Sequence, residues 1–119
     1  MLEFLTDGTS HLLIRHNTVL LNDVNGATGA ISVMGDSGDD VLVERNMVAG
    51  GVYTIYPGGP NYTNIRFLDN CFSTVFYPGQ AKTGAYNAWY PSNNPPGLVR
   101  TGNTWCDGPN SGQALDDNP

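Results

Sequence analysis

Four segments of the chain share one alternation of apolar and polar positions, and each segment ends in asparagine. An aliphatic residue lies five positions before the asparagine, and in the first three segments an apolar residue lies three positions before it. An apolar or aromatic residue also follows two positions after the asparagine. A period of two residues is typical of a β-strand with one buried face. The segments are residues 12–17, 41–46, 65–70 and 98–103.

A second apolar stretch precedes each of these segments, with a turn-rich run between the two. These stretches are residues 2–5, 30–34, 52–56 and 85–90. The asparagines recur at intervals of 29, 24 and 33 residues. Repeats of this length that hold several short strands and no helix are typical of a solenoid of stacked coils. The pattern therefore predicts an all-β fold of about three to four coils.

The repeated asparagine has a physical role in such a stack. Asparagine tolerates a left-handed backbone, and its amide can bond neighbouring backbone groups. In coils stacked about 4.8 Å apart, aligned amides can also bond one another as a ladder. The expected ladder consists of Asn17, Asn46, Asn70 and Asn103. A β-sandwich with coincidental asparagine spacing is the alternative, although its hairpins favour Asn-Gly pairs, which occur here only at Asn25-Gly26.

Three features together resemble a known group of proteins. They are the Arg/Glu-x-Asn coil endings, the run from Gly50 to Tyr56, and the tail from Phe76-Tyr77-Pro78-Gly79 to Gly102-Asn103-Thr104-Trp105. From residue 2 to about residue 108, the chain resembles the C-terminal coils of bacterial right-handed parallel β-helix proteins of the pectin-lyase-like superfamily. The resemblance implies a right-handed parallel β-helix with a C-terminal loop cap around residues 77–97, an extracellular location and an association with polysaccharides. Because the superfamily includes lyases, hydrolases, epimerases, binding modules and phage spikes, the resemblance does not fix an activity.

Length and charge narrow the range of partners. A chain of 119 residues fits one domain spanning residues 1–119. The net charge is −6 with only five basic residues, which argues against nucleic acid and weighs against polyanionic sugars. No apolar run reaches the roughly 20 residues of a membrane span, so we expect no membrane partner. The start of the chain lacks a signal-peptide pattern, and we expect a module or fragment of a longer protein.

Acidic residues are the candidates for catalysis and for metal binding. Asp36, Asp39 and Asp40 could serve a polysaccharide lyase or a glycoside hydrolase, or they could hold calcium. A solvated turn is the favoured interpretation of Asp39-Asp40, because these residues follow Gly35-Asp36-Ser37-Gly38. His11 and His16 lie on opposite faces of a strand and cannot share one metal without a bend. We therefore expect no cofactor, with calcium as the alternative.

The aromatic residues of the second half point to a ligand. Flat rings beside asparagine and aspartate groups suit sugars, which present apolar C–H faces and hydroxyl rims. The alternative is that these rings fill a wide core or cap the end of the solenoid. The expected binding residues are Tyr53, Tyr56, Asp69, Tyr86, Asn87, Trp89 and Tyr90.

The function that the sequence favours is a non-catalytic module that binds a neutral polysaccharide. A fragment of a lyase or hydrolase is the first alternative, and a structural or oligomerising β-helix is the second. Open solenoid ends predict either a homo-oligomer that pairs end to end or a further segment that precedes this chain. Cys71 and Cys106 allow one disulfide, but they lie two positions out of register in adjacent coils, so the sequence leaves their pairing open.

Overall fold

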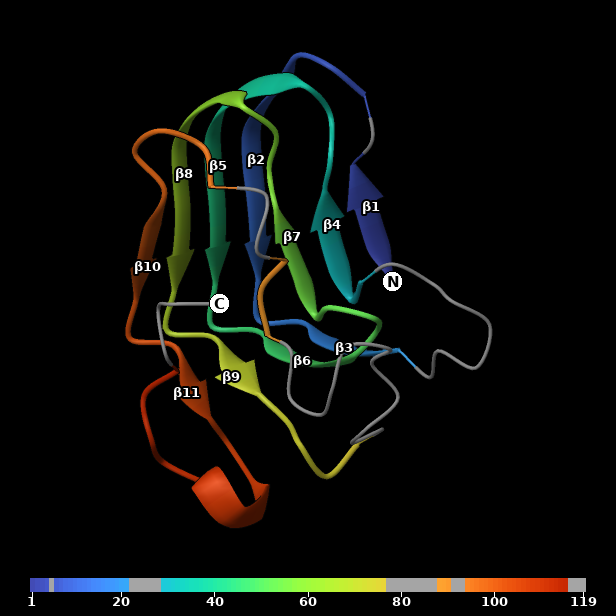
Figure 1. Ribbon diagram of the computed structural model, residues 1–119, viewed down its shortest axis with the longest axis vertical. Coiled ribbons are helices and arrows are strands. Elements are labelled where there is room, and N and C mark those ends of the chain that lie inside the picture. The colour runs from blue at the N-terminus through green and yellow to red at the C-terminus, as the bar shows by residue number, and fades with distance from the viewer. Residues whose placement is uncertain (5, 22–28, 77–87, 91–93, 116–119) are drawn as a thin grey trace.

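The chain forms short strands connected by turns in a computed structural model that describes residues 1–4, 6–21, 29–76, 88–90 and 94–115. Figure 1 shows the strands side by side in successive layers. The elements of the described part are β1 (Leu2–Phe4), β2 (Thr9–Arg15), β3 (Thr18–Leu21), β4 (Ile31–Val33), β5 (Ser37–Glu44), β6 (Met47–Gly50), β7 (Ile55–Pro57), β8 (Asn61–Leu68), β9 (Cys71–Phe72), β10 (Val99–Thr101), β11 (Thr104–Trp105) and a 3₁₀ turn (Gly108–Asn110).

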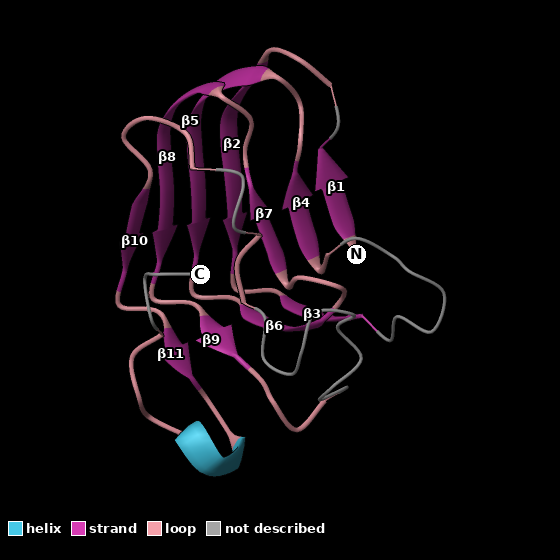
Figure 2. Ribbon diagram, in the orientation of Figure 1, coloured by secondary structure: helices cyan, strands magenta, loops and turns pink. Residues whose placement is uncertain are grey.

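The strands form three sheets in which all neighbouring strands are parallel. The first sheet has the order β1-β4-β7, the second β10-β8-β5-β2 and the third β11-β9-β6-β3. The chain visits the first, second and third sheets in turn and then repeats the circuit (Figure 2). We call one circuit a coil. The expectation of an all-β fold with parallel strands is confirmed. No helix among the described residues is long and apolar enough to span a membrane.

A fourth coil continues the first sheet beyond β7. Trp89 bridges Ile55 in parallel, since the Ile55 amide donates to the Ala88 carbonyl at 2.8 Å and the Tyr90 amide donates to the Ile55 carbonyl at 2.9 Å. Residues 88–90 therefore lie where a loop cap over 77–97 was expected, and they extend the stack instead. Residues 77–87 and 91–93 of that expected cap lie outside the described part of the chain.

The C-terminal segment covers the free edge of the third sheet. Thr104 and Ala114 form an antiparallel bridge, and the Leu115 amide donates to the Asn103 carbonyl at 3.0 Å. Leu115 is buried and packs into the core cluster. This segment supplies both hydrogen bonds and an apolar side chain. It therefore covers an exposed end of the stack, which is the role that the sequence assigned to a cap over residues 77–97.

The inward positions of the second sheet explain the apolar alternation. Leu12, Val41 and Ile65 stand in register on β2, β5 and β8, and Ile14, Val43 and Phe67 form a second row. The β5 and β8 members of both rows are essentially inaccessible. Each apolar side chain is thus covered by its equivalent in the next coil, which is why the pattern recurs in phase with the asparagine.

The four asparagines form a ladder along the stack. The Asn46 Nδ2 donates to the Asn70 Oδ1 at 3.0 Å and to the Ile14 carbonyl at 3.0 Å, while the Asn46 backbone amide donates to the same Oδ1 at 3.1 Å. Asn17 with Asn46, and Asn70 with Asn103, repeat the bonds between side chains and from backbone to side chain. Asn46 and Asn70 are each 1% exposed. The ladder therefore pairs polar groups that would otherwise lie buried without a partner.

The left-handed backbone does not fall on the asparagines themselves. It falls on the residue before each one, namely His16 (φ 56°), Arg45 (φ 52°), Asp69 (φ 53°) and Gly102 (φ 71°). The residue before each asparagine makes the backbone bend, and the asparagine side chain then bonds the equivalent asparagine of the next coil. The left-handed residue expected at each corner is therefore present, but it lies one position before the asparagine. A second aligned set of left-handed residues lies six positions before the ladder: His11 (φ 53°), Asp40 (φ 55°), Asn64 (φ 52°) and Gly97 (φ 77°).

The last two coils are also joined covalently. Cys71 and Cys106 form a disulfide with a Cα–Cα distance of 5.2 Å. Next to it, the Asp107 carboxylate accepts hydrogen bonds from the Thr74 amide at 2.7 Å, the Val75 amide at 3.1 Å and the Ser73 hydroxyl. Burial alone would raise the pKa of Asp107, but these hydrogen bonds hold that pKa below its usual range.

Candidate functional site

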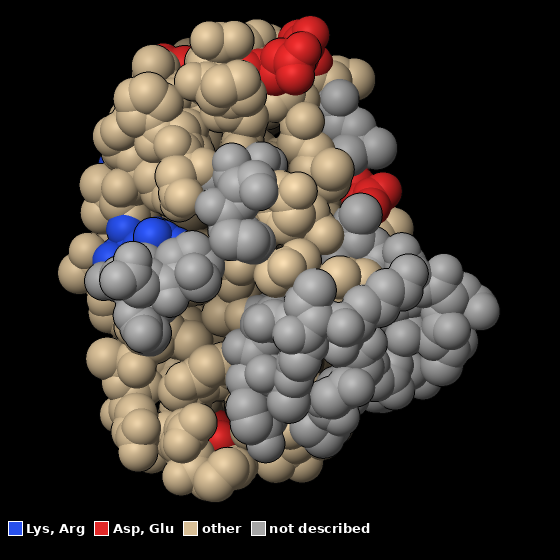
Figure 3. All heavy atoms as spheres, in the orientation of Figure 1, with Lys and Arg blue, Asp and Glu red and all other residues tan. Residues whose placement is uncertain are grey.

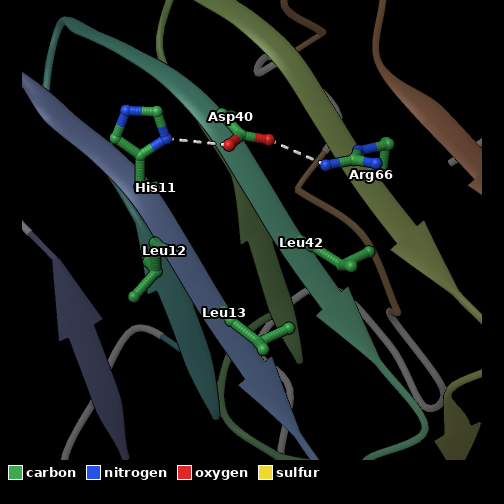
Figure 4. A pocket seen from close by; sticks show the side chains of 6 residues that line it. All are labelled: His11, Leu12, Leu13, Asp40, Leu42 and Arg66. Carbon is green, nitrogen blue, oxygen red and sulfur yellow. Dashed lines mark hydrogen bonds and ion pairs between the residues drawn. The ribbon is translucent and has the colours of Figure 1, made fainter.

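A shallow hollow of about 180 Å³ lies on the outer face of the second sheet. Its floor is apolar, because Leu13 of β2 and Leu42 of β5 stand in register and point outward. Leu13 is 53% exposed. Arg66 of β8 occupies the next position of the same row. Figure 4 shows the leucines beside a polar group formed by His11, Asp40 and Arg66.

The polar group is held together by Asp40. The His11 Nδ1 lies 2.9 Å from the Asp40 Oδ2, and the Arg66 guanidinium donates to the Asp40 Oδ1 at 2.8 Å (Figure 4). The Asn64 side chain donates to the same Oδ1 at 3.1 Å. His11, Asp40 and Asn64 lie side by side because all three belong to the aligned left-handed set on neighbouring strands.

The electrostatics of the group favour an ionised Asp40. The hydrogen bond with His11 holds the pKa of Asp40 below its usual range, and the charge of Arg66 acts in the same direction. The His11 side chain is 81% exposed. When neutral His11 donates Nδ1–H to Asp40, its Nε2 is an acceptor that faces away from the pair. The hollow thus presents fixed donors and an acceptor beside an apolar floor.

Polar side chains extend the same face on both sides of the hollow. The Thr63 hydroxyl donates to the Asp39 Oδ1 at 2.6 Å, and both residues are exposed. Arg15 and Glu44 form a longer ion pair at 3.8 Å. On the face of the molecule seen in Figure 3, the charged side chains are few and separated from one another.

The expected aromatic binding residues that the structure describes do not form the exposed surface that the sequence predicts. Trp89 is 2% exposed, and its ring lies 5.3 Å from that of Phe67 and 5.4 Å from that of Phe72. It stands in register with the inward Ile55, so its ring enters the core. The expectation of a stacking ring at Trp89 is therefore wrong, and the alternative that the aromatics fill the core holds for this residue.

Three tyrosines pack mainly on one another. Tyr56 is buried and stacks on Tyr90 with ring centroids 4.6 Å apart, while Tyr53 meets the Tyr90 ring edge-on at 5.2 Å. Burial raises the pKa of Tyr56, and the neighbouring tyrosines raise it further. The expectation of an exposed ring is therefore also wrong for Tyr56, because residues 52–54 form a bend and Ile55 and Tyr56 are both buried. Tyr53 and Tyr90 are half-buried.

The other expected ligand-binding residues are not gathered around the tyrosines. Asp69 is exposed at the left-handed corner between β8 and β9, whereas the tyrosines belong to the first sheet and its neighbouring turns. Tyr86 and Asn87 lie outside the described residues.

The three acidic candidates bond to different partners, namely Asp36 to Asp7, Asp39 to Thr63, and Asp40 to His11 and Arg66. Asp39 and Asp40 lie within β5, not in the solvated turn expected for them, because the left-handed Asp40 (φ 55°) does not end the strand. Asp36 precedes this strand, and its backbone amide donates to the Asp7 Oδ1 at 2.6 Å. Among the residues that the structure describes, no group of three or more histidine, cysteine, aspartate or glutamate side chains is arranged to hold a metal ion.

Sequence reasoning missed His11 and Arg66 as partners of Asp40. A signal for the first of them exists in the sequence, because His11, Asp40 and Asn64 each lie six positions before a ladder asparagine. Comparisons with known proteins give no match to a family model, to a curated protein or to a solved structure.

Proposed function

We propose that this chain is a non-catalytic carbohydrate-binding module that holds a neutral polysaccharide on the outer face of the second sheet. The observation that carries the proposal is the hollow in which His11, Asp40 and Arg66 stand beside the exposed Leu13 and the half-buried Leu42. This site replaces the tyrosine and tryptophan surface as the place of binding.

The chemistry of the hollow matches the two kinds of surface on a sugar. Hydroxyl rims both donate and accept hydrogen bonds, and Asp40, Asn64 and the His11 ring supply acceptors and donors at fixed positions. The leucine side chains offer an apolar surface to the C–H faces of the ring. Because the hollow is shallow and open, a long polymer can lie across it without threading an end into a cavity.

The charge balance favours a neutral polymer. Within the hollow, the Arg66 guanidinium is already paired with Asp40, which leaves no unpaired cation there to attract an anionic sugar. The net charge of −6 on the whole chain repels polyanions as well.

We infer that the fold is a right-handed parallel β-helix of four coils. The repeated circuit through three parallel sheets supports this, and crossover connections between parallel strands are right-handed in about 98% of cases. The disulfide between Cys71 and Cys106 fits an oxidising compartment, which supports an extracellular location.

Binding to immobilised polysaccharides tests the function. We expect retention on a neutral polymer such as xylan or β-glucan and little retention on pectin. Asp40→Asn removes a charged acceptor and should weaken binding about ten-fold, the equivalent of roughly 1.4 kcal/mol. Asp69→Asn is the matched control, because it makes the same change at another left-handed position away from the hollow. Equal binding by the two variants, or no binding to any polymer, would contradict the proposal.

One observation favours a catalytic alternative. The exposed His11 ring on Asp40 has the arrangement of a general base held in one tautomer, which a polysaccharide lyase or a glycoside hydrolase could use. Release of reducing ends that disappears in His11→Gln would favour this alternative. If wild-type protein binds a polysaccharide and releases none, the non-catalytic function stands.

A further inference from the structure

Three charged or titratable side chains line the hollow, namely His11, Asp40 and Arg66. Arg66 is a permanent cation. The hydrogen bond with His11 holds the pKa of Asp40 below its usual range, so this carboxylate stays ionised where histidine titrates, between about pH 5 and about pH 8. Among these three side chains, only His11 therefore changes its charge in that range.

The hydrogen bond to Asp40 fixes where the His11 ring gains a proton. The His11 Nδ1 lies 2.9 Å from the Asp40 Oδ2, and an ionised carboxylate only accepts hydrogen bonds, so Nδ1 carries a hydrogen in both states of the ring. The additional proton binds Nε2, which lies on the far side of the ring from Asp40 (Figure 4). Acidification thus converts Nε2 from a neutral acceptor into a charged donor.

The neighbouring charges do not cancel this change. Besides His11 itself, the charged side chains of the three strands that line the hollow are Arg15 on β2, Asp39, Asp40 and Glu44 on β5, and Arg66 on β8. Arg15 pairs with Glu44 at 3.8 Å, and Asp39 accepts the Thr63 hydroxyl at 2.6 Å. Carboxylates and guanidinium groups ordinarily keep one charge between about pH 5 and about pH 8. Protonation of His11 therefore raises the charge of this face by one unit, whatever its starting value.

We propose that His11 makes the ligand preference of the hollow depend on pH, so that acidification shifts it from a neutral polymer towards one that carries carboxylate groups. The His11 side chain is 81% exposed, so a bound ligand can reach Nε2. In the neutral ring, Nε2 accepts a hydrogen bond from a sugar hydroxyl and offers no donor to a carboxylate. In the protonated ring, it donates a charge-assisted hydrogen bond to a carboxylate. The inference deepens the proposed function and rests on it, because it concerns the same hollow.

A pair of polymers that share one backbone tests the preference. Unsubstituted xylan is neutral, whereas glucuronoxylan carries glucuronate side groups on the same backbone. The affinity of the intact chain for each polymer is measured at about pH 8 and at about pH 5.5, towards the two ends of the histidine range. From the higher to the lower pH, the ratio of the affinity for glucuronoxylan to that for xylan should rise about two- to five-fold, the usual effect of one exposed ion pair.

Two single-residue variants separate His11 from the other histidine. In His11→Gln, the ratio should be the same at both pH values, because glutamine does not titrate. His16→Gln is the matched control, since His16 is also exposed and left-handed (φ 56°, against 53° for His11) but does not line the hollow. The control variant should keep the whole shift of the wild-type protein.

Nitrogen chemical shifts of the imidazole rings test the geometry without any ligand. His11 should carry its hydrogen on Nδ1 at the higher pH and a hydrogen on each nitrogen at the lower pH. An Nε2–H tautomer at the higher pH, a ratio that does not change with pH, a shift that survives His11→Gln, or a shift lost in His16→Gln would each overturn the inference and leave polysaccharide binding intact. Binding of neither polymer at either pH would instead contradict the proposed function, and the inference with it.

Discussion

Replacing Asn70 with alanine tests the asparagine ladder where it is most deeply buried. The Asn70 Oδ1 accepts hydrogen bonds from the Asn46 amide and side chain, and its Nδ2 donates to the Val43 carbonyl at 2.9 Å and to the Asn103 Oδ1 at 3.0 Å. Alanine would leave the Asn46 backbone amide buried without an acceptor, whereas the Val43 carbonyl keeps its place in the parallel ladder between β5 and β8. An unpaired buried group costs about 1–3 kcal/mol, so the free energy of unfolding should fall by about that amount.

Asn17→Ala is the control for this prediction, since it makes the same chemical change at the exposed end of the ladder. The Asn17 Nδ2 donates to the nearby Arg15 carbonyl at 2.9 Å, and water can replace what the side chain provides. We expect a cost below about 1 kcal/mol at this position. Urea unfolding followed by circular dichroism, with the disulfide intact, measures both values. Equal costs for the two variants would refute the claim that burial gives the ladder its energetic weight.

Trp89→Ala should cost about 3–5 kcal/mol in a thermal or urea melt, because it leaves a cavity in the core, and a fully stable variant would contradict the core position. Tyr62→Phe should leave stability unchanged or raise it by up to about 1 kcal/mol, because the buried Tyr62 hydroxyl has no hydrogen-bond partner among the described residues. A clear loss of stability in that variant would show that the hydroxyl is paired. Asp40 and Asp107 have folded-state pKa values below the ordinary value of about 3.9, so the stability they contribute is present above that pH and is lost as pH falls below it. In acid melts, Asp107→Asn should therefore lose less stability than wild type between pH 5 and 2.

The stacking of the coils could be predicted from the sequence, because the asparagine ladder forms only between coils in register. An asparagine can bond its equivalent only when the two coils are in register, so the spacing of Asn46 and Asn70 also fixes the register of Val41 with Ile65 and of Val43 with Phe67. The strands next to the asparagines therefore follow from the sequence with few errors. The first sheet is less certain from sequence, because it lacks such a marker and depends on the lengths of the connecting turns.

The aromatic residues show why that marker matters. Alternation predicts an outward Tyr53 or Tyr56 only if residues 52–56 form one regular strand, but residues 52–54 form a bend. Tyr56 is then covered by Tyr90, which is distant in sequence and belongs to the next coil. The candidate site was missed for a related reason: a bond such as that from Arg66 to Asp40 joins two coils two positions out of register, and the row of asparagines does not reveal such diagonal contacts.

The asparagine ladder has a direction, and this constrains how a protein of this kind can change in length. Every backbone amide in the ladder donates toward the following coil, so an inverted coil would place donor against donor. Successive asparagines are 29, 24 and 33 residues apart, yet the hydrogen bonds between them are the same. The ladder therefore has one asparagine in each coil, and its hydrogen bonds do not depend on the number of residues in the coil. Insertions belong in the turns between the aligned strands, and whole coils can be duplicated or deleted from one asparagine to the next without disturbing the remainder.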